Sequence, residues 1–127
     1  MSTQCPAPAA ALRAIGMHPK YVGYGCSLEI LKYTLAHPEA VYRLPQAVYP
    51  RIMELFGCSR AALDRNLRFA ILRTWESGNR QLLSSLFSSS FHGDWVPTNT
   101  EFISVMTDYL LHGTDASCAG IYPSIRA

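Results

Sequence analysis

Three arginines lie close together near the start of the segment SRAALDRNLRFAILRTWESGN, residues 59–79. They are Arg60, Arg65 and Arg68, and Ala61 and Ala62 lie between the first two. A guanidinium group can fork onto O6 and N7 of a guanine or hold a phosphate, and alanines beside it let a backbone come close to a base edge. The chemistry that these residue types suggest is therefore recognition of an anion or a base, without catalysis.

A helix over residues 59–76 must position these groups. With Leu63 at the centre of the buried side, a rotation of about 100° per residue places Arg65 near 200° and Arg68 near 140°. We therefore expect the two guanidinium groups to project into solvent side by side. Leu72 falls on the same side farther along, where we expect other helices to cover it. The expected buried stripe is Leu63, Leu67, Ala70 and Thr74, flanked by Ser59.

The link before this helix is short. A helix ending at Phe56 is followed by the residues Gly-Cys-Ser, and Ser59 is a good N-cap. Two helices joined by about three residues including a glycine often form a helix-turn-helix, whose second helix lies in the DNA major groove. An ordinary helical hairpin with a solvated basic face has the same pattern, and the residues alone leave both interpretations open.

Helix start and stop residues recur along the chain and predict an all-α fold of about six helices. Residues 17–26 are expected to form a loop, because proline and glycine break regular structure there. Pro50 either kinks the third helix or marks its start. We expect one domain over residues 9–113, a disordered lead over 1–8 and a loose tail over 114–127. The expected helix starts are Pro8, Ser27, Pro45 or Pro50, Ser59, Asn79 and Thr98, the last in a capping box with Glu101.

The composition favours a globular protein with no membrane span. The chain has 127 residues, 49% hydrophobic and 16% charged, and a net charge of +2. Any polyanion site must therefore come from local clustering of charge. The four cysteines form no C-x-x-C pair, and we expect free thiols in a reducing compartment. The N-terminus has no secretory signal pattern, so we expect a cytoplasmic protein.

Catalysis and metal binding are not expected. The loop SSSFHGDW at residues 88–95 brings serine, histidine and aspartate together, but a catalytic triad needs residues that converge from distant parts of the chain. The histidines are scattered beside proline or glycine and do not have metal-ligand spacing. We therefore predict no enzyme activity, no metal and no cofactor. Trp75 and Trp95 are expected to anchor the core.

Several motifs carry a resemblance to a known family. They occur in order at nearly constant spacing: IG at 15–16, GY at 23–24, VYP at 48–50, LDRNLRFAI at 63–71, W at 75 with GN at 78–79, SSLF at 84–87 and PTNTEFI at 97–103. On these residues the chain resembles the C-terminal DNA-binding domain of the sporulation-initiation response regulator, stage 0 sporulation protein A. The resemblance covers about residues 12–111.

The resemblance implies a six-helix effector domain whose third and fourth helices form the helix-turn-helix. It implies a sequence-specific transcription regulator that binds double-stranded DNA as a tandem dimer, with pairing through the helix 98–112. Arg65 and Arg68 match arginines that face DNA, Asp64 matches an acidic position beside them, and Ser59 matches the polar residue at the helix start. From their positions, Arg60 and Arg80 are candidate backbone contacts.

The chain departs from the family pattern on the expected reading face. Ala62 stands where an additional arginine is usual and Phe69 where a histidine is usual, so fewer phosphate contacts are expected. Phe69 can contact a thymine methyl, but we favour packing in the core or against a subunit. Residues 1–11 supply no receiver domain, so we expect a stand-alone effector domain or a fragment. The alternative function is a protein-interaction module that pairs with a related regulator without binding DNA.

Overall fold

Six α-helices and two short helical segments form the part of the chain that the structure describes. The structure is a computed structural model, and it describes residues 7–87 and 95–113. Within these ranges it contains no β-strand, which confirms the all-α prediction. The elements are α1 (Pro8–Ala14), α2 (Val22–Ala36), the 3₁₀ helix η1 (Pro38–Tyr42), the π-helical segment η2 (Leu44–Val48), α3 (Tyr49–Phe56), α4 (Arg60–Ser77), α5 (Arg80–Leu86) and α6 (Asn99–His112).

Side-chain caps fix the starts of the last three helices, as their sequences predict. The Ser59 and Asn79 side chains each accept a hydrogen bond from a backbone N–H three residues later, at 3.1 and 3.0 Å. Thr98 and Glu101 make both bonds of the capping box at the start of α6, at 2.8 and 3.1 Å. These bonds satisfy N–H groups that have no partner inside the helix, so the starts of α4, α5 and α6 are set locally.

The predicted loop over residues 17–26 is wrong in its second half. Helix α2 begins at Val22, and Ser27, the expected N-cap, is fully buried inside it. A Cβ atom on Gly23 would lie 2.2 Å from the carbonyl oxygen of Asn66 in α4. This glycine therefore allows two helices to approach closely and does not interrupt the helix, despite its low intrinsic helix propensity.

The chain between α2 and α3 forms short helical segments that the sequence did not predict. The 3₁₀ helix η1 and the π-helical segment η2 follow one another before α3. Pro50 lies in the first turn of α3, where its missing N–H costs no intrahelical hydrogen bond. Of the two alternatives, the later helix start is therefore correct, and Pro50 does not kink the helix.

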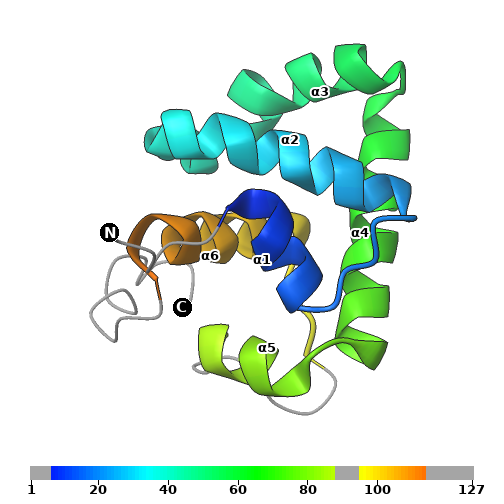
Figure 1. Cartoon of the computed structure of the whole chain (residues 1–127). Coiled ribbons are helices and arrows are strands. Elements are labelled where there is room, and N and C mark those ends of the chain that lie inside the picture. Colours follow the sequence, from blue (N-terminus) through cyan, green and yellow to red (C-terminus); the bar gives the residue numbers. More distant parts are fainter. Residues whose placement is uncertain (1–6, 88–94, 114–127) are drawn as a thin grey trace.

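Helix α4 stands along one side of the molecule, and α2, α3, α5 and α6 pack against it (Figure 1). Helix α3 lies at one end of α4 and α5 at the other, while the start of α2 packs against the middle of α4 (Figure 1). The buried hydroxyls of Thr34 in α2 and Thr107 in α6 are 2.8 Å apart, which satisfies two polar groups inside the core. Among the fully buried side chains are Leu12, Ile15, Ile30, Leu31, Leu63, Leu67, Ile71, Phe102 and Ile103.

An aromatic cluster fills the core where α4 meets α5 and α6. Trp75 is 5% exposed, and its ring makes edge contacts with Phe87 at 4.9 Å and Phe102 at 6.2 Å between centroids. Trp95 is half-buried and joins the same cluster at 6.5 Å from Trp75. The prediction that both tryptophans anchor the core is confirmed. One face of the C-terminal half of α4 therefore belongs to the core.

No helix in the described ranges is both long enough and apolar enough to cross a membrane.

Candidate nucleic-acid interface

The turn between α3 and α4 has the geometry that its sequence predicts. Gly57 adopts the left-handed conformation with φ 62° and ends α3. The backbone N–H of Cys58 then donates to the carbonyl oxygen of Met53 at 3.0 Å, which closes the last turn. Ser59 caps α4 immediately afterwards. Two helices joined in this way form a helix-turn-helix unit that is compatible with the family it resembles.

Helix α4 turns one face to the core and the opposite face to solvent. The predicted stripe is buried at Leu63, Leu67, Ala70 and Thr74. Arg65 is exposed, as expected, and Ala61 beside it is exposed as well. The first turns of α4 therefore offer a guanidinium group and a small side chain to solvent, which is the surface that a groove-reading helix needs.

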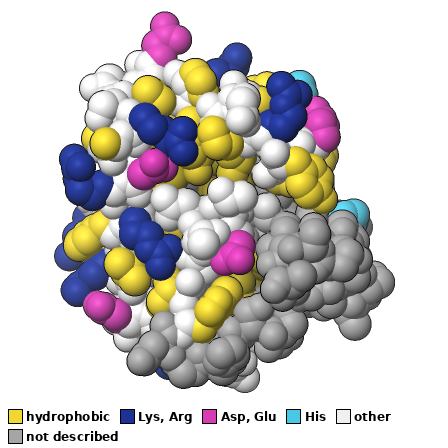
Figure 2. Space-filling model, turned by 180° about the vertical axis from the view of Figure 1, so that it is seen from behind, with side chains coloured by type: hydrophobic (Ala, Val, Ile, Leu, Met, Phe, Trp, Pro, Cys, Tyr) yellow, Lys and Arg dark blue, Asp and Glu magenta, His cyan; other side chains and the backbone are white. Residues whose placement is uncertain are grey.

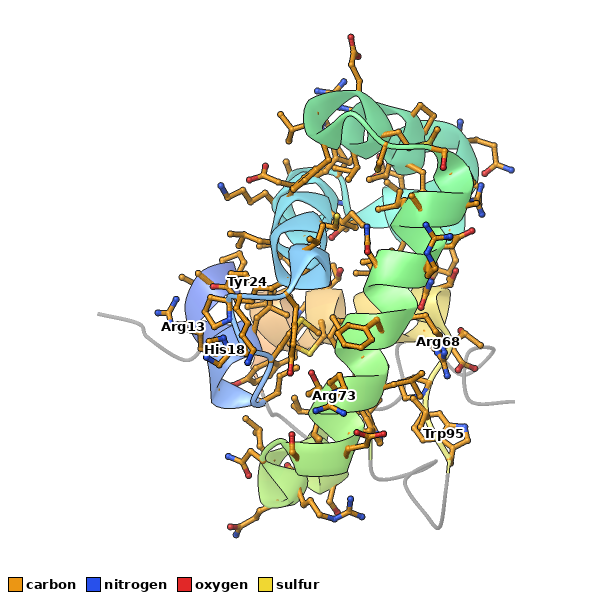
Figure 3. All side chains as sticks on the ribbon, turned by 90° about the vertical axis from the view of Figure 1, so that its right-hand side faces the viewer. Arg13, His18, Tyr24, Arg68, Arg73 and Trp95 are labelled. Carbon is orange, nitrogen blue, oxygen red and sulfur yellow. The ribbon has the colours of Figure 1, made fainter. Side chains whose placement is uncertain are left out.

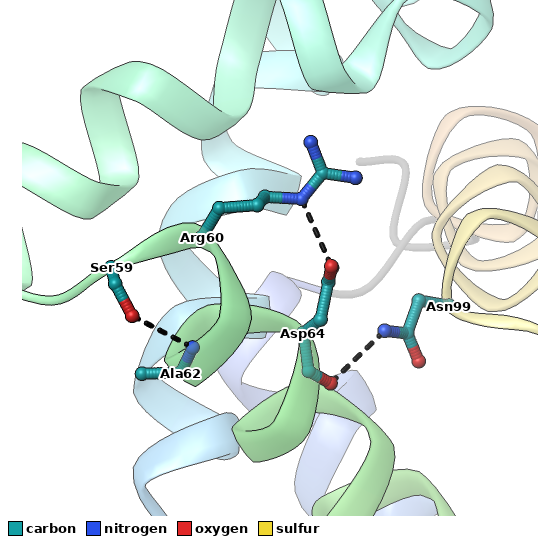
Figure 4. A network of polar contacts seen from close by, with 5 residues as sticks. All are labelled: Ser59, Arg60, Ala62, Asp64 and Asn99. Carbon is teal, nitrogen blue, oxygen red and sulfur yellow. Dashed lines mark hydrogen bonds and ion pairs between the residues drawn. The ribbon is translucent and has the colours of Figure 1, made fainter.

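Arg60 and Asp64 form a pair one turn apart on α4. The Nε group of Arg60 donates to the Asp64 carboxylate at 3.0 Å, and the two side chains are 48% and 43% exposed (Figure 4). The Arg60 guanidinium also lies over the ring of Tyr49, 4.8 Å from its centroid. Burial, followed by the Asp64 charge, raises the pKa of Tyr49, while Arg60 and a hydrogen bond from Thr100 act against that rise. The pair is thus held against α3.

Arg68 differs from Arg65, and the expectation that the two project side by side into solvent is wrong for Arg68. Its side chain is half-buried and donates a hydrogen bond to the carbonyl oxygen of Pro97, two residues before α6. Figure 3 shows Arg68 on the flank of α4 that faces away from Arg13 and His18. The wheel projection could not predict this contact, because a rotation angle contains no information about which distant segment lies beside it.

A second bond joins the same two segments. The side-chain amide of Asn99, the first residue of α6, donates to the backbone carbonyl of Asp64 at 3.2 Å (Figure 4). Together with the Arg68–Pro97 bond it holds the start of α6 against the exposed end of α4. A shallow, open cleft of about 380 Å³ lies between them, lined by Tyr49, Arg60, Asp64, Arg68, Thr98, Asn99 and Thr100.

Four of these lining residues are absent from the sequence-based site: Tyr49, Thr98, Asn99 and Thr100. The sequence identified Thr98 only as a helix cap, and nothing in it placed the start of α6 beside residues 60–68. Tyr49 lies within the VYP motif but was not assigned a role at the site. These four residues are identified only by their proximity to Arg60, Asp64 and Arg68 in the folded chain.

Phe69 lies outside the core, so packing in the core, one of the two placements that we favoured, is wrong, while packing against a subunit stays a prediction. The residue is 52% exposed and its ring contacts that of Tyr21 edge-on at 5.4 Å. Leu72, three residues later, is 37% exposed, so the expectation that other helices cover it is also wrong. Ala62 is half-buried beside the turn.

Arg80 does not join the other candidate residues. It lies at the start of α5, at the opposite end of α4 from Ser59 (Figure 1). Its guanidinium donates to the carbonyl oxygen of Trp75 at 3.4 Å. The fold therefore brings Ser59, Arg60, Ala62, Asp64, Arg65 and Arg68 onto the first half of α4, with Phe69 immediately after Arg68, and leaves Arg80 apart.

Charge on the surface is clustered and mixed in sign. Figure 2 shows several Lys and Arg side chains toward one edge of the molecule, with Asp and Glu side chains among them. With a net charge of only +2, such local clustering is what a site for a polyanion would require.

The loop at residues 88–94, which contains His92 and Asp94, lies outside the described residues, as do residues 1–6 and 114–127. The predictions made for these segments concern residues that the structure does not describe.

Comparison with protein families agrees with the geometry of the turn and of α4. The family model described as the sporulation initiation factor Spo0A C terminal matches residues 9–110, which include every helix from α2 to α5 and most of α1 and α6. This family consists of DNA-binding regulator domains. The chain therefore belongs to the Spo0A C-terminal family, the DNA-binding effector domains of sporulation regulators.

Proposed function

We propose that this protein is a sequence-specific DNA-binding transcription regulator that reads the major groove with the first turns of α4. The single observation that carries the proposal is the exposure of Arg65 on the second turn after a capped helix-turn-helix link. Ala61, one turn earlier, is small enough to let the helix approach base edges. Membership in a DNA-binding family supports the same conclusion.

The two arginines have different tasks in this proposal. Arg65 is exposed, so its guanidinium can fork onto a guanine in the groove. Arg68 is held at one nitrogen by Pro97, and its remaining N–H groups lie at the cleft beside α6. We assign Arg68 to a backbone phosphate at the groove edge, because phosphate contacts fix the register of a helix without reading sequence.

The cleft supplies further contacts with the same phosphate backbone. Arg60 and the Thr100 hydroxyl line it together with Arg68. Asp64 offsets part of this positive charge, and its carboxylate can accept from a cytosine amino group once Arg60 turns to a phosphate. Ser59 orients the helix as its cap. We assign Arg80 to a DNA phosphate farther from the reading residues, since it lies beyond the far end of α4.

Pairing of two copies on DNA through α6 belongs to the same proposal. Val105 and Tyr109 are only half-buried on α6 and leave apolar surface for a second subunit. Since the start of α6 is bonded to α4 through Asn99, a partner on α6 would sit close to the reading helix.

Selection from random double-stranded DNA tests the proposal. The 127-residue chain is expected to enrich a defined sequence and to bind it with an affinity that falls as salt rises. The Arg65→Ala variant is expected to enrich that sequence less strongly, and because the side chain is exposed, it can be removed without disturbing the core. If no duplex is enriched and binding to every duplex is absent at low salt, the proposal is wrong.

The alternative, a module that pairs with a related regulator and does not bind DNA, is supported by a different feature. Ala62 and Phe69 contribute no charge to the face that holds Arg65, and Arg68 already donates to Pro97. A pull-down with a full-length member of the family, carried out without DNA, separates the two. Retention of that partner together with failure of the DNA selection favours the alternative.

A further inference from the structure

Four apolar side chains lie on the outer surface where the start of α2 meets the middle of α4. They are Tyr21, Val22, Phe69 and Leu72, and we call them the Tyr21–Phe69 patch. Val22 is 56% exposed and Phe69 is 52% exposed. The Tyr21 and Phe69 rings contact each other edge-on at 88°, so aromatic side chains from the cap of α2 and from α4 meet at this surface.

The patch sits on α4 one turn beyond the groove-reading residues. Phe69 follows Arg65 by four residues, and Leu72 follows Phe69 by three, so the three side chains are neighbours along one helix face. The cleft that contains Arg68 lies on the other flank of α4 (Figure 3). A molecule bound at the patch therefore does not have to occupy the cleft.

Positive charge surrounds these apolar groups. The Lys20 ammonium lies 5.7 Å from the centroid of the Tyr21 ring. The Arg73 guanidinium forms a hydrogen bond with the Tyr21 side chain. This bond is the largest cause of the raised pKa of Arg73. Arg65 is exposed at the edge nearer the turn. Glu76, which pairs with Arg73 at 3.0 Å, offsets one of these charges, and the surrounding charge stays positive.

This combination selects the kind of molecule that can cover the patch. Exposed aromatic and aliphatic groups are buried favourably only by other apolar groups, which a phosphate backbone does not provide. Aromatic rings beside arginine are typical of protein interfaces, where they carry much of the binding energy. The surrounding cations require carboxylates for charge complementarity.

We propose that the Tyr21–Phe69 patch binds an acidic protein segment. Aliphatic or aromatic side chains of that segment cover Phe69 and Val22, while its carboxylates pair with Lys20 and Arg73. Binding does not require DNA, because the patch is formed by the folded chain alone. The carboxylates of the segment pair with Lys20 and Arg73 and do not need Arg65, the proposed base contact, so this proposal and the proposed DNA binding can each fail without the other.

Selection of random linear peptides displayed on phage tests this proposal with the full chain as bait. The enriched peptides are expected to combine Asp or Glu with aromatic or aliphatic residues. Their affinities are then measured by fluorescence anisotropy for the wild type and for the Phe69→Ser and Lys20→Glu variants. Each substitution is expected to weaken binding by about tenfold or more, as for a residue at the centre of an interface.

Two matched substitutions serve as controls. Leu55 in α3 is 63% exposed and lies outside the patch, so Leu55→Ser removes a comparable apolar group elsewhere. Lys32 lies farther along α2 and pairs with Glu29 at 3.3 Å, so Lys32→Glu controls for net charge. Both are expected to change peptide affinity by less than about twofold. The Val22→Ser variant provides a second test of the patch should Phe69→Ser lower the thermal midpoint of unfolding.

Several results would overturn the proposal. One is the absence of an enriched peptide, and another is enriched peptides whose affinity is unchanged by Phe69→Ser and Val22→Ser. Self-association of the wild type that is lost in Phe69→Ser, measured by sedimentation equilibrium, would assign the patch to a second copy. Weaker duplex binding by Phe69→Ser, with no acidic peptide selected, would assign it to DNA.

Discussion

The guanidinium group of Arg68 donates a hydrogen bond to the carbonyl oxygen of Pro97, 29 residues later in the chain. This bond ties the middle of α4 to Pro97, two residues before α6, and Asn99 repeats the link through the Asp64 carbonyl. The bond restricts Arg68, whereas Arg65 three residues earlier is exposed. Two arginines that a wheel projection makes equivalent are therefore expected to differ in their effect on DNA binding.

Replacing Arg68 with alanine is expected to weaken binding to all duplexes by a similar factor. A phosphate contact carries no sequence information, and its loss should reduce the slope of log affinity against log salt by about 1. Fluorescence anisotropy over a range of salt concentrations measures this slope. Arg43, an exposed arginine between η1 and η2, supplies the control, because Arg43→Ala removes the same charge elsewhere. A loss confined to one base pair would contradict the assignment of Arg68 to phosphate.

Replacing Arg65 with alanine is expected to weaken binding at one base pair of the site and not equally on every duplex. If Arg65 forks onto a base, the variant loses about 1–3 kcal/mol of discrimination at one base pair of the selected site. Competition between the selected duplex and duplexes with single substitutions measures that loss. The thermal midpoint should hardly change, since the side chain is exposed. Equal weakening on every duplex would show that Arg65 does not read a base.

Replacing Gly23 with alanine is expected to destabilise the fold. The new methyl group would lie 2.2 Å from the Asn66 carbonyl oxygen, and both belong to packed helices that must move apart. Overpacking of this kind typically costs about 1–3 kcal/mol of unfolding free energy, and a clash with backbone lies at the upper end. Urea denaturation followed by circular dichroism gives the value.

Gly25 is the control for helix propensity at the same end of α2. A Cβ there meets only the Phe56 ring, at 3.3 and 3.4 Å. Gly25→Ala is therefore expected to be neutral or stabilising by up to about 1 kcal/mol, because alanine favours a helix more than glycine does. Equal destabilisation by both substitutions would mean that close approach of α2 and α4 is not the reason for Gly23.

Cys26 is expected to resist alkylation in the folded protein. Burial, with a smaller contribution from Cys58, raises the pKa of the Cys26 thiol to about 11. Since the thiolate is the reactive form, only about 1 in 1,000 of these thiols is ionised near pH 8. Mass spectrometry after iodoacetamide treatment should show Cys26 unmodified without denaturant and modified in urea. The half-buried Cys58 is the comparison within the same chain.

The same pKa shift gives a pH dependence of stability. Because the folded-state pKa lies above the ordinary value of 9.0, the neutral thiol contributes stability that is fully present below about pH 9. That contribution is lost as the pH rises through about 11. The unfolding free energies of the wild type and of Cys26→Ala are compared at several pH values between 9 and 11. The stability advantage of the wild type over Cys26→Ala should shrink as the pH rises.

The starts of α4, α5 and α6 were predictable from sequence because capping is a local interaction. Ser59, Asn79 and Thr98 each bond to a backbone group three residues away, so the few residues around each cap determine the geometry. The buried stripe of α4 and the all-α class follow from periodicity, which is also local. The Spo0A C-terminal family could be recognised for a related reason, since its motifs are short and ordered along the chain.

The tertiary structure alone decided the features that depend on distant segments. Gly23 reads as a helix breaker until Asn66 lies against it, and Arg68 reads as a solvent-exposed group until Pro97 lies beside it. Phe69 looks suited to the core but meets Tyr21 at the surface. Helix periodicity fixes the angle of a side chain about its own axis, whereas burial and bonding depend on which other helix packs there. Those contacts form only when the whole core assembles.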